Sequence, residues 1–104
     1  MSDALMAKIR REQIRWFLLV AANVSRPVGI YTEAMLPIVQ ATYPDATHKE
    51  IRINLDYLSE RGLVHITRDG MDRWFVELTR FGIDLVEYTV PVEPGIARPQ
   101  ITAG

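Results

Sequence analysis

The segment from Thr47 to Gly62 carries clear start and stop signals for a helix, and it limits the possible fold more than any other segment. Thr47-His48-Lys49-Glu50 has the spacing of a capping box, in which the Thr47 hydroxyl accepts from the Glu50 N–H and the Glu50 carboxylate accepts from the Thr47 N–H. Gly62 is the residue type best able to take the left-handed conformation that ends a helix. The apolar residues between them share one helical face: Ile51, Leu55 and Leu58. The pattern predicts a helix from Thr47 to Arg61 with one buried side.

Two short β-prone segments follow this helix. Apolar and polar side chains alternate along Val64 to Arg68 and along Arg73 to Leu78. The linking residues 69–72 include Gly70, which permits a positive φ angle, so the two segments are predicted to pair as a hairpin. Thr79 is then placed to cap a last helix. The apolar residues of that helix are Phe81, Leu85 and Val86.

The chain changes character after Thr89. Four turn-forming residues occur close together there: Pro91, Pro94, Gly95 and Pro99. They disfavour regular secondary structure. We therefore expect one domain over residues 1–90 and an extended or disordered proline-rich tail over residues 91–104.

The N-terminal segment is predicted to form a long helix. Ser2 or Asp3 can cap it, and no Gly or Pro interrupts it before Ser25-Arg26-Pro27. One apolar stripe recurs at helical spacing and suits the core: Ile14, Phe17, Leu18 and Ala21. Further apolar residues of this segment predict a contact with a second subunit: Leu5, Ile9, Trp16, Leu19 and Val20. A homodimer through this helix is therefore expected.

A short strand and a second helix are expected after this break. Residues 28–31 are β-prone, and Thr32 offers an N-cap for a helix through about Tyr43. Pro37 is awkward inside that helix because proline removes one backbone hydrogen bond. A later start, with Pro37 in the first turn, is therefore also open.

Composition fixes the broad class of the protein but leaves its partners open. The 104 residues suit one domain, and the 48% hydrophobic and 24% charged fractions are globular values. No apolar run approaches the ~20 residues of a membrane span, and no secretory signal pattern is found, so we expect a cytoplasmic protein without membrane contact. The chain has no cysteine, which excludes disulfides and thiolate metal sites. The net charge is −1, whereas nucleic-acid binders usually show a basic excess, so any DNA binding must depend on where the charges lie.

The order of the expected elements resembles that of the winged helix-turn-helix family. Leu55-Asp-Tyr-Leu58-Ser-Glu-Arg-Gly62-Leu63-Val64 resembles the L-x-x-L-x-x-x-G-L-[VI] ending of that family's recognition helix. Leu78-Thr79-Arg80-Phe81-Gly82 resembles the L-T-x-x-G of bacterial regulators of the multiple-antibiotic-resistance and phenolic-acid-repressor types. The resemblance covers about Arg11 to Tyr88 and implies a mostly helical α+β fold with a two-stranded wing. The proline-rich tail has no counterpart in those families, and it resembles small proteins of Mu-like prophages.

The resemblance implies a DNA-binding transcriptional regulator with the third helix in the major groove and the hairpin, Val64 to Leu78, as the wing. Given the inward residues, the outward positions of the helix are His48, Lys49, Arg52, Ile53 and Asp56, with Tyr57 beside them. Lys49 and Arg52 suit phosphate or a guanine edge, and His48 suits phosphate near the helix N-terminus. Arg68 and Arg73 flank the wing turn and suit phosphates.

These assignments have plainer alternatives. Asp56 lies on the same helix face and repels phosphate, and an outward charged face is often only solvated. Arg68 and Arg73 are as well placed to pair with nearby carboxylates, namely Asp69, Asp72 or Glu77, as with phosphate. The second hypothesis is therefore a protein-interaction module on the same scaffold, such as a phage-encoded accessory protein, with no DNA binding. Its contact surfaces would be the first helix and the tail.

The sequence offers little support for catalysis. It has two histidines, no cysteine and no glycine-rich phosphate loop, and no spacing suggests a nucleophile with its base. Asp45, His48 and Glu50 lie close together, but their roles in a turn, a helix start and a capping box explain them better than a metal site. We expect a protein that is not an enzyme and that needs no metal or cofactor.

Overall fold

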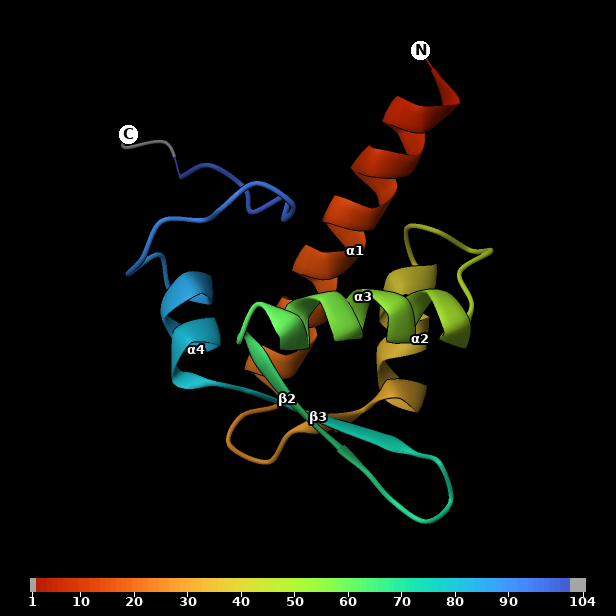
Figure 1. Cartoon of the computed structure of the whole chain (residues 1–104), viewed down its shortest axis with the longest axis vertical. Helices are drawn as coiled ribbons and strands as arrows, with labels where there is room; N and C mark the ends of the chain where they lie inside the picture. The colour runs from red at the N-terminus through yellow and green to blue at the C-terminus, as the bar shows by residue number, and fades with distance from the viewer. Residues whose placement is uncertain (1, 102–104) are drawn as a thin grey trace.

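The computed structural model describes residues 2–101, and it has an α+β fold in which helices predominate (Figure 1). Within these described residues, four helices and three short strands follow one another in this order: α1 Asp3–Val24, β1 Ile30–Tyr31, α2 Thr32–Gln40, α3 His48–Glu60, β2 Val64–Arg68, β3 Trp74–Leu78 and α4 Arg80–Val86. This arrangement is consistent with the expected winged-helix-like architecture.

Helix α1 passes behind α3 and rises well above it (Figure 1). Its N-terminus is capped by Ser2, whose hydroxyl accepts from the Leu5 N–H at 3.1 Å. Ser2 was one of the two residues predicted as the cap. The first two turns lie outside the body of the protein, and their apolar side chains are exposed: Leu5, Met6 and Ile9. The second half of α1 lies within the domain.

The core lies where α1, α2 and α3 meet the sheet. Its fully buried residues include Ile14 and Leu18 of α1, Met35 and Val39 of α2, and Ile51, Leu55 and Leu58 of α3. Leu19 also has 0% exposure, so it belongs to this core and has no surface to offer a second subunit. The expectation that Leu19 lies at a dimer interface is therefore wrong, because α1 is covered on that side by the chain itself.

The predicted hairpin forms, but its register differs by one residue from the one that a four-residue loop over 69–72 would give, because β3 begins at Trp74 and not at Arg73; a third strand extends the hairpin. Val64 lies opposite Leu78, and Arg68 lies opposite Trp74. Strand β1 pairs antiparallel with β3, which gives a three-stranded sheet in the order β1-β3-β2 instead of an isolated two-stranded wing. The added strand attaches the middle of β3, at Phe75 and Val76, to the segment that joins α1 and α2.

Helix α2 differs from its prediction at both ends. Tyr31 occupies the N-cap position, and Thr32 is the first helical residue, with its side chain fully buried. Pro37 lies inside the helix, so the possible later start is wrong. The backbone continues through this position, since the Ala41 N–H donates to the Pro37 carbonyl at 3.1 Å. The helix ends at Gln40, and after it the N–H groups of Thr42 and Tyr43 both donate to the Val39 carbonyl.

Glycine ends α3 and permits the docking of α4. Gly62 has φ +74°, and the Leu63 N–H donates to the Leu58 carbonyl at 2.9 Å, the pattern of a Schellman motif. The Thr79 hydroxyl caps α4 by accepting from the Gly82 N–H at 3.0 Å. A Cβ atom at Gly82 would overlap the Leu63 carbonyl oxygen, so only glycine allows α4 to pack this closely.

Residues 91–101 are extended, as the prolines predict, but they are packed onto the domain. Ile96 is 8% exposed and joins the core. The Ala97 N–H donates to the Glu12 carbonyl of α1, and Arg98 Nη1 donates to the Leu85 carbonyl at 2.9 Å. These contacts do not support a disordered tail or a boundary at residue 90 for the described residues.

Candidate nucleic-acid interface

The outer face of α3 lies beside the hairpin, and the site residues expected from sequence are distributed along both. His48, Lys49 and Ile53 are exposed on α3, with Ile53 57% exposed. Arg52 and Tyr57 are only partly exposed. The first two turns of α3 therefore provide most of the open surface that could contact a groove.

The charge on α3 changes sign along its length. His48 and Lys49 are exposed in the first turn, whereas Asp56 and Glu60 are exposed in the second half. Because carboxylates repel the phosphate backbone, only the N-terminal half of the exposed face has the charge that suits nucleic acid. Contact through N-terminal residues is also how recognition helices usually meet base edges.

Two ion pairs link α3 and the hairpin in a reciprocal way. Arg52 of α3 donates from Nη1 to the Asp72 carboxylate at 3.0 Å and from Nη2 to the Asp72 carbonyl at 2.6 Å. Arg68 of the hairpin donates to Asp56 of α3 at 3.2 Å. Each element thus supplies one cation and one anion, and the hairpin is held at a fixed position relative to α3.

Trp74 lies between these two ion pairs. The guanidinium carbons of Arg52 and Arg68 lie 4.8 Å and 4.2 Å from the centre of its ring, within the range of cation–π attraction. Trp74 is 7% exposed, and its indole N–H finds no acceptor among residues 2–101. The stack is therefore held by ring contacts and by the flanking ion pairs.

Asp69 organises the tip of the hairpin. Its carboxylate accepts from the backbone N–H groups of Met71 and Arg73 and from Arg73 Nε at 2.8 Å. The hydrogen bond from the Arg73 backbone N–H is the main reason that the pKa of Asp69 lies below its usual range. The same carboxylate raises the pKa of Arg73 above its ordinary value. The positive φ of the turn falls on Asp72, at +59°, and not on Gly70, where the sequence had suggested it.

The arginines expected to contact DNA are consequently all paired with aspartates. Arg52 pairs with Asp72, Arg68 with Asp56, and Arg73 with Asp69, so the junction of α3 and the hairpin holds equal numbers of positive and negative side chains. Lys49 forms no ion pair with any residue in the 2–101 range. Carboxylate pairing was the expected alternative for Arg68 and Arg73: Arg73 pairs with Asp69 as expected, whereas Arg68 pairs with Asp56 of α3. Arg52, for which the alternative was a solvated face, also pairs with a carboxylate.

A second set of contacts joins α3 to α1, and no sequence pattern predicted it. Arg10 donates to both oxygens of the Glu50 carboxylate at 2.8 Å and to Asp45, also at 2.8 Å. These bonds hold the pKa of Asp45 below its usual range, chiefly through the Arg10 side chain. Half of the predicted capping box is confirmed, since the Glu50 N–H donates to the Thr47 hydroxyl at 3.2 Å. The Glu50 carboxylate binds Arg10 in place of the Thr47 N–H.

Tyr57 lies on the side of α3 that faces the tail and α1. Its ring lies between Arg15, 3.5 Å from the ring centre, and Arg61, at 4.8 Å. Arg15 is 9% exposed and donates to Asn54 Oδ1 at 3.0 Å and to the Gly95 carbonyl at 2.9 Å. Burial lowers the pKa of Arg15, because removal from water disfavours the charged form. These contacts give Tyr57 a place in the packing of α1, α3 and the tail.

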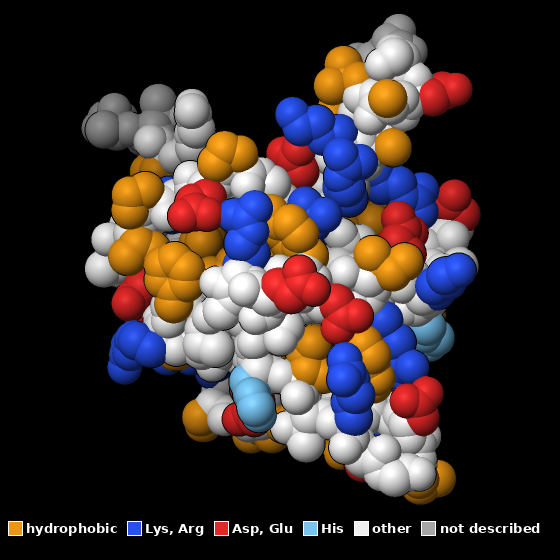
Figure 2. Space-filling view, in the orientation of Figure 1, with side chains coloured by type: hydrophobic (Ala, Val, Ile, Leu, Met, Phe, Trp, Pro, Cys, Tyr) orange, Lys and Arg blue, Asp and Glu red, His pale blue; other side chains and the backbone are white. Residues whose placement is uncertain are grey.

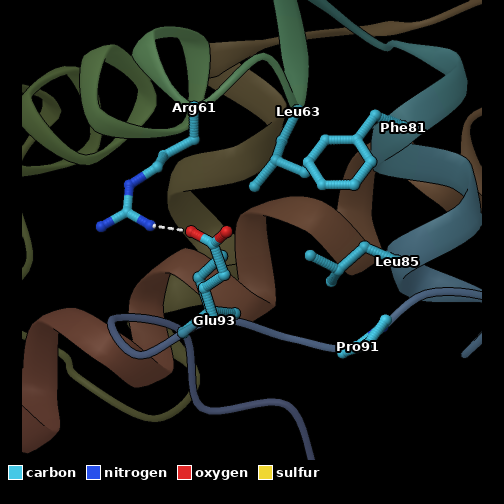
Figure 3. A pocket seen from close by; sticks show the side chains of 7 residues that line it. Arg61, Leu63, Phe81, Leu85, Pro91 and Glu93 are labelled. Carbon is cyan, nitrogen blue, oxygen red and sulfur yellow. Dashed lines mark hydrogen bonds and ion pairs between the residues drawn. The ribbon is translucent and has the colours of Figure 1, made fainter.

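A small cavity lies where the tail arches over α3 and α4 (Figure 3). Arg61 and Glu93 form an ion pair of 2.7 Å beside it. Its apolar lining comes from Leu63, Phe81, Leu85, Pro91 and Ile96. The cavity encloses about 70 Å³, well below the ~300 Å³ at which ligand sites usually begin. We therefore assign it no ligand.

The part of the chain that the structure describes, residues 2–101, contains no group of three or more His, Asp or Glu side chains arranged to hold a metal ion. Over the same range, no helix combines the length and the apolar character needed to cross a bilayer. A scan against protein-family models found no match for the chain, and a search of curated proteins also found none. The functional argument therefore depends on the geometry alone.

Proposed function

We propose that the chain is a transcriptional regulator that binds double-stranded DNA through α3 and the hairpin. The observation that supports this most is the open N-terminal half of α3 beside a hairpin that two reciprocal ion pairs hold in place. A recognition element must keep its shape when it enters a groove, because ordering it on binding would reduce the affinity. The exposed side chains His48, Lys49 and Ile53 then have defined directions.

Each of these side chains has a chemical task in the proposal. Lys49 and His48 contact phosphates or acceptor atoms in the major groove, and Ile53 is suited to the methyl group of thymine. Arg52 reads guanine or holds a phosphate only if it gives up the Asp72 carboxylate. Two copies would bind half-sites separated by about one helical turn. The exposed or half-buried α1 residues Leu5, Ile9, Trp16 and Val20 remain the proposed dimer contact.

The test is a fluorescence anisotropy titration of the protein against a labelled random duplex at several salt concentrations. Each phosphate contact steepens the plot of log K against log salt by about 0.9. Lys49→Gln should therefore flatten the slope by about 0.9 per subunit. Arg26→Gln is the matched control, because Arg26 pairs with Glu87 far from α3 and carries the same charge. If the unsubstituted protein fails to bind any duplex at low salt, the proposal is wrong.

A protein-interaction module is the second candidate, and a separate observation favours it. The ion pairs of Arg52, Arg68 and Arg73 leave the α3–hairpin junction without net charge, which suits a protein surface better than a phosphate backbone. The exposed apolar side chains of this surface are Ile53 and Met71, which is 79% exposed. A photo-crosslinker placed at position 53 distinguishes the candidates, since it should attach to DNA under the first proposal and to a protein under the second.

A further inference from the structure

Basic side chains gather at a second place, along the part of α1 that rises above α3 (Figure 2). We call residues 3–11 of α1 the α1 arm. Its cations are Lys8, Arg10 and Arg11. Arg10 is engaged by two carboxylates, but Arg11 forms no ion pair with another described residue, and Lys8 has only a loose contact of 3.9 Å with Glu12. The arm therefore holds cations that are available to an anion.

Lys8 and Arg11 point to the same side of α1 as Arg15. The three residues recur at intervals of three and four, so they form one row along the helix. Arg15 fixes the direction of that row, because its Nε donates to Asn54 of α3. At 1.5 Å per residue, Arg11 and Lys8 lie about 6 Å and 10 Å further along the helix axis. Both are exposed, and they therefore lie above the edge of α3, on the side that α3 occupies.

The arm is continuous with the basic end of α3. The ion pair between Arg10 and Glu50 joins the two helices where α3 begins, next to Lys49. This region holds five basic side chains, namely Lys8, Arg10, Arg11, Arg15 and Lys49. It holds four acidic ones, namely Asp3 at the start of the arm, Glu12, Asp45 and Glu50. The junction of α3 and the hairpin has three of each, so the positive excess lies on the α1 side of α3.

We infer that the α1 arm forms a second contact with the DNA backbone, through Lys8 and Arg11, and that the hairpin arginines do not. The inference rests on the proposed DNA binding by α3. A phosphate gains most from a cation that has no carboxylate partner, because a paired cation must first give up that partner. The arm thus contacts phosphates that flank the base pairs under α3, while the hairpin mainly supports α3 from the other side.

Two double variants test this contact in the anisotropy titration described above. Lys8→Gln with Arg11→Gln removes two exposed cations, and glutamine keeps a good helix propensity. This variant should flatten the salt slope by about 1.8 per bound subunit, from two lost phosphate contacts. Arg68→Gln with Asp56→Asn is the control, because it removes a whole ion pair of the hairpin junction and leaves the net charge unchanged. Its slope should equal that of the unsubstituted protein.

The outcomes separate this inference from the function on which it rests. If the unsubstituted protein binds no duplex, the proposed function fails and the arm has no DNA to contact. If the protein binds and the arm variant keeps the full slope, the inference is wrong although DNA binding stands. A reduced slope for the hairpin variant alone would also overturn it, since the backbone contact would then belong to the hairpin. Circular dichroism of both variants confirms that the comparison is made between folded proteins.

Discussion

Asp72 controls whether Arg52 can act on DNA, so replacing it tests the candidate interface directly. We predict that Asp72→Asn makes the protein bind duplex DNA more tightly. The Asp72 carboxylate lies 3.0 Å from Arg52 Nη1, and its side chain is 79% exposed. Asparagine keeps the shape of the side chain and tolerates the left-handed backbone at this position, φ +59°. The Asp72 carbonyl still accepts from Arg52 Nη2, so the guanidinium should remain over Trp74.

The size of the effect follows from the exposure of this ion pair. Exposed pairs contribute about 0–1 kcal/mol, which is the free energy that a phosphate must now overcome to take Arg52 from Asp72. Removing that competition should tighten DNA binding up to about fivefold, since 1.4 kcal/mol corresponds to a factor of ten. If Arg52 then contacts a phosphate, the salt slope becomes steeper by about 0.9. Stability should fall by no more than about 1 kcal/mol.

The assay is the same anisotropy titration at three or more salt concentrations, with urea denaturation to check stability. Glu87→Gln is the matched control, because it removes one exposed carboxylate that pairs with Arg26 at 3.5 Å, away from α3. Equal tightening by both variants would mean that only net charge matters. An Asp72→Asn protein with unchanged affinity and unchanged slope would show that Arg52 does not face the DNA.

Four further predictions concern the fold and its assembly. Gly82→Ala should lower the free energy of unfolding by about 2–4 kcal/mol, from overpacking and a disturbed hydrogen bond to the Leu63 carbonyl, and an unchanged urea midpoint would contradict this. Because the pKa of Asp69 is lowered, its contribution to the loop should be complete above the usual value of about 4 and lost as pH falls through the lower folded value; an NMR titration midpoint at or above 4 would contradict this. Leu19→Asp should unfold the protein, because it buries an unpaired charge. Ile9→Asp should stay folded and reduce the mass in light scattering, whereas a monomer mass before substitution would refute the dimer.

The elements with local signals could be predicted from the sequence. Thr47, Gly62 and Thr79 act within three or four residues of their own positions, so the start of α3, its end and the start of α4 all follow the sequence pattern. The alternation of apolar residues likewise predicted the hairpin, although Arg68 lies opposite Trp74 and not opposite Arg73 as the expected four-residue loop implied. The bounds of strand β1 were harder to predict, because its two residues form a strand only by pairing with β3.

The contacts that decide the charge of the candidate site are not local. Arg52 and Asp72 are 20 residues apart, and Arg10 and Glu50 are 40 residues apart. Which carboxylate reaches an arginine depends on how the helices pack, and no spacing rule covers such distances. The prediction for Leu19 was wrong for the same reason. When a helix is apolar on several sides, its sequence does not show which sides are buried by the same chain and which by a partner.

The Arg15 side chain links the proline-rich segment to α3 by hydrogen bonds. The Arg15 guanidinium donates both to Asn54 of α3 and to the Gly95 carbonyl. Removing residues 91–101 from the domain would break the bond to Gly95 and would expose one edge of the Tyr57 ring. A fragment truncated at residue 90 would therefore carry an altered α3 as well as a shorter end, and dissection experiments on this protein should retain the segment at least through Arg98.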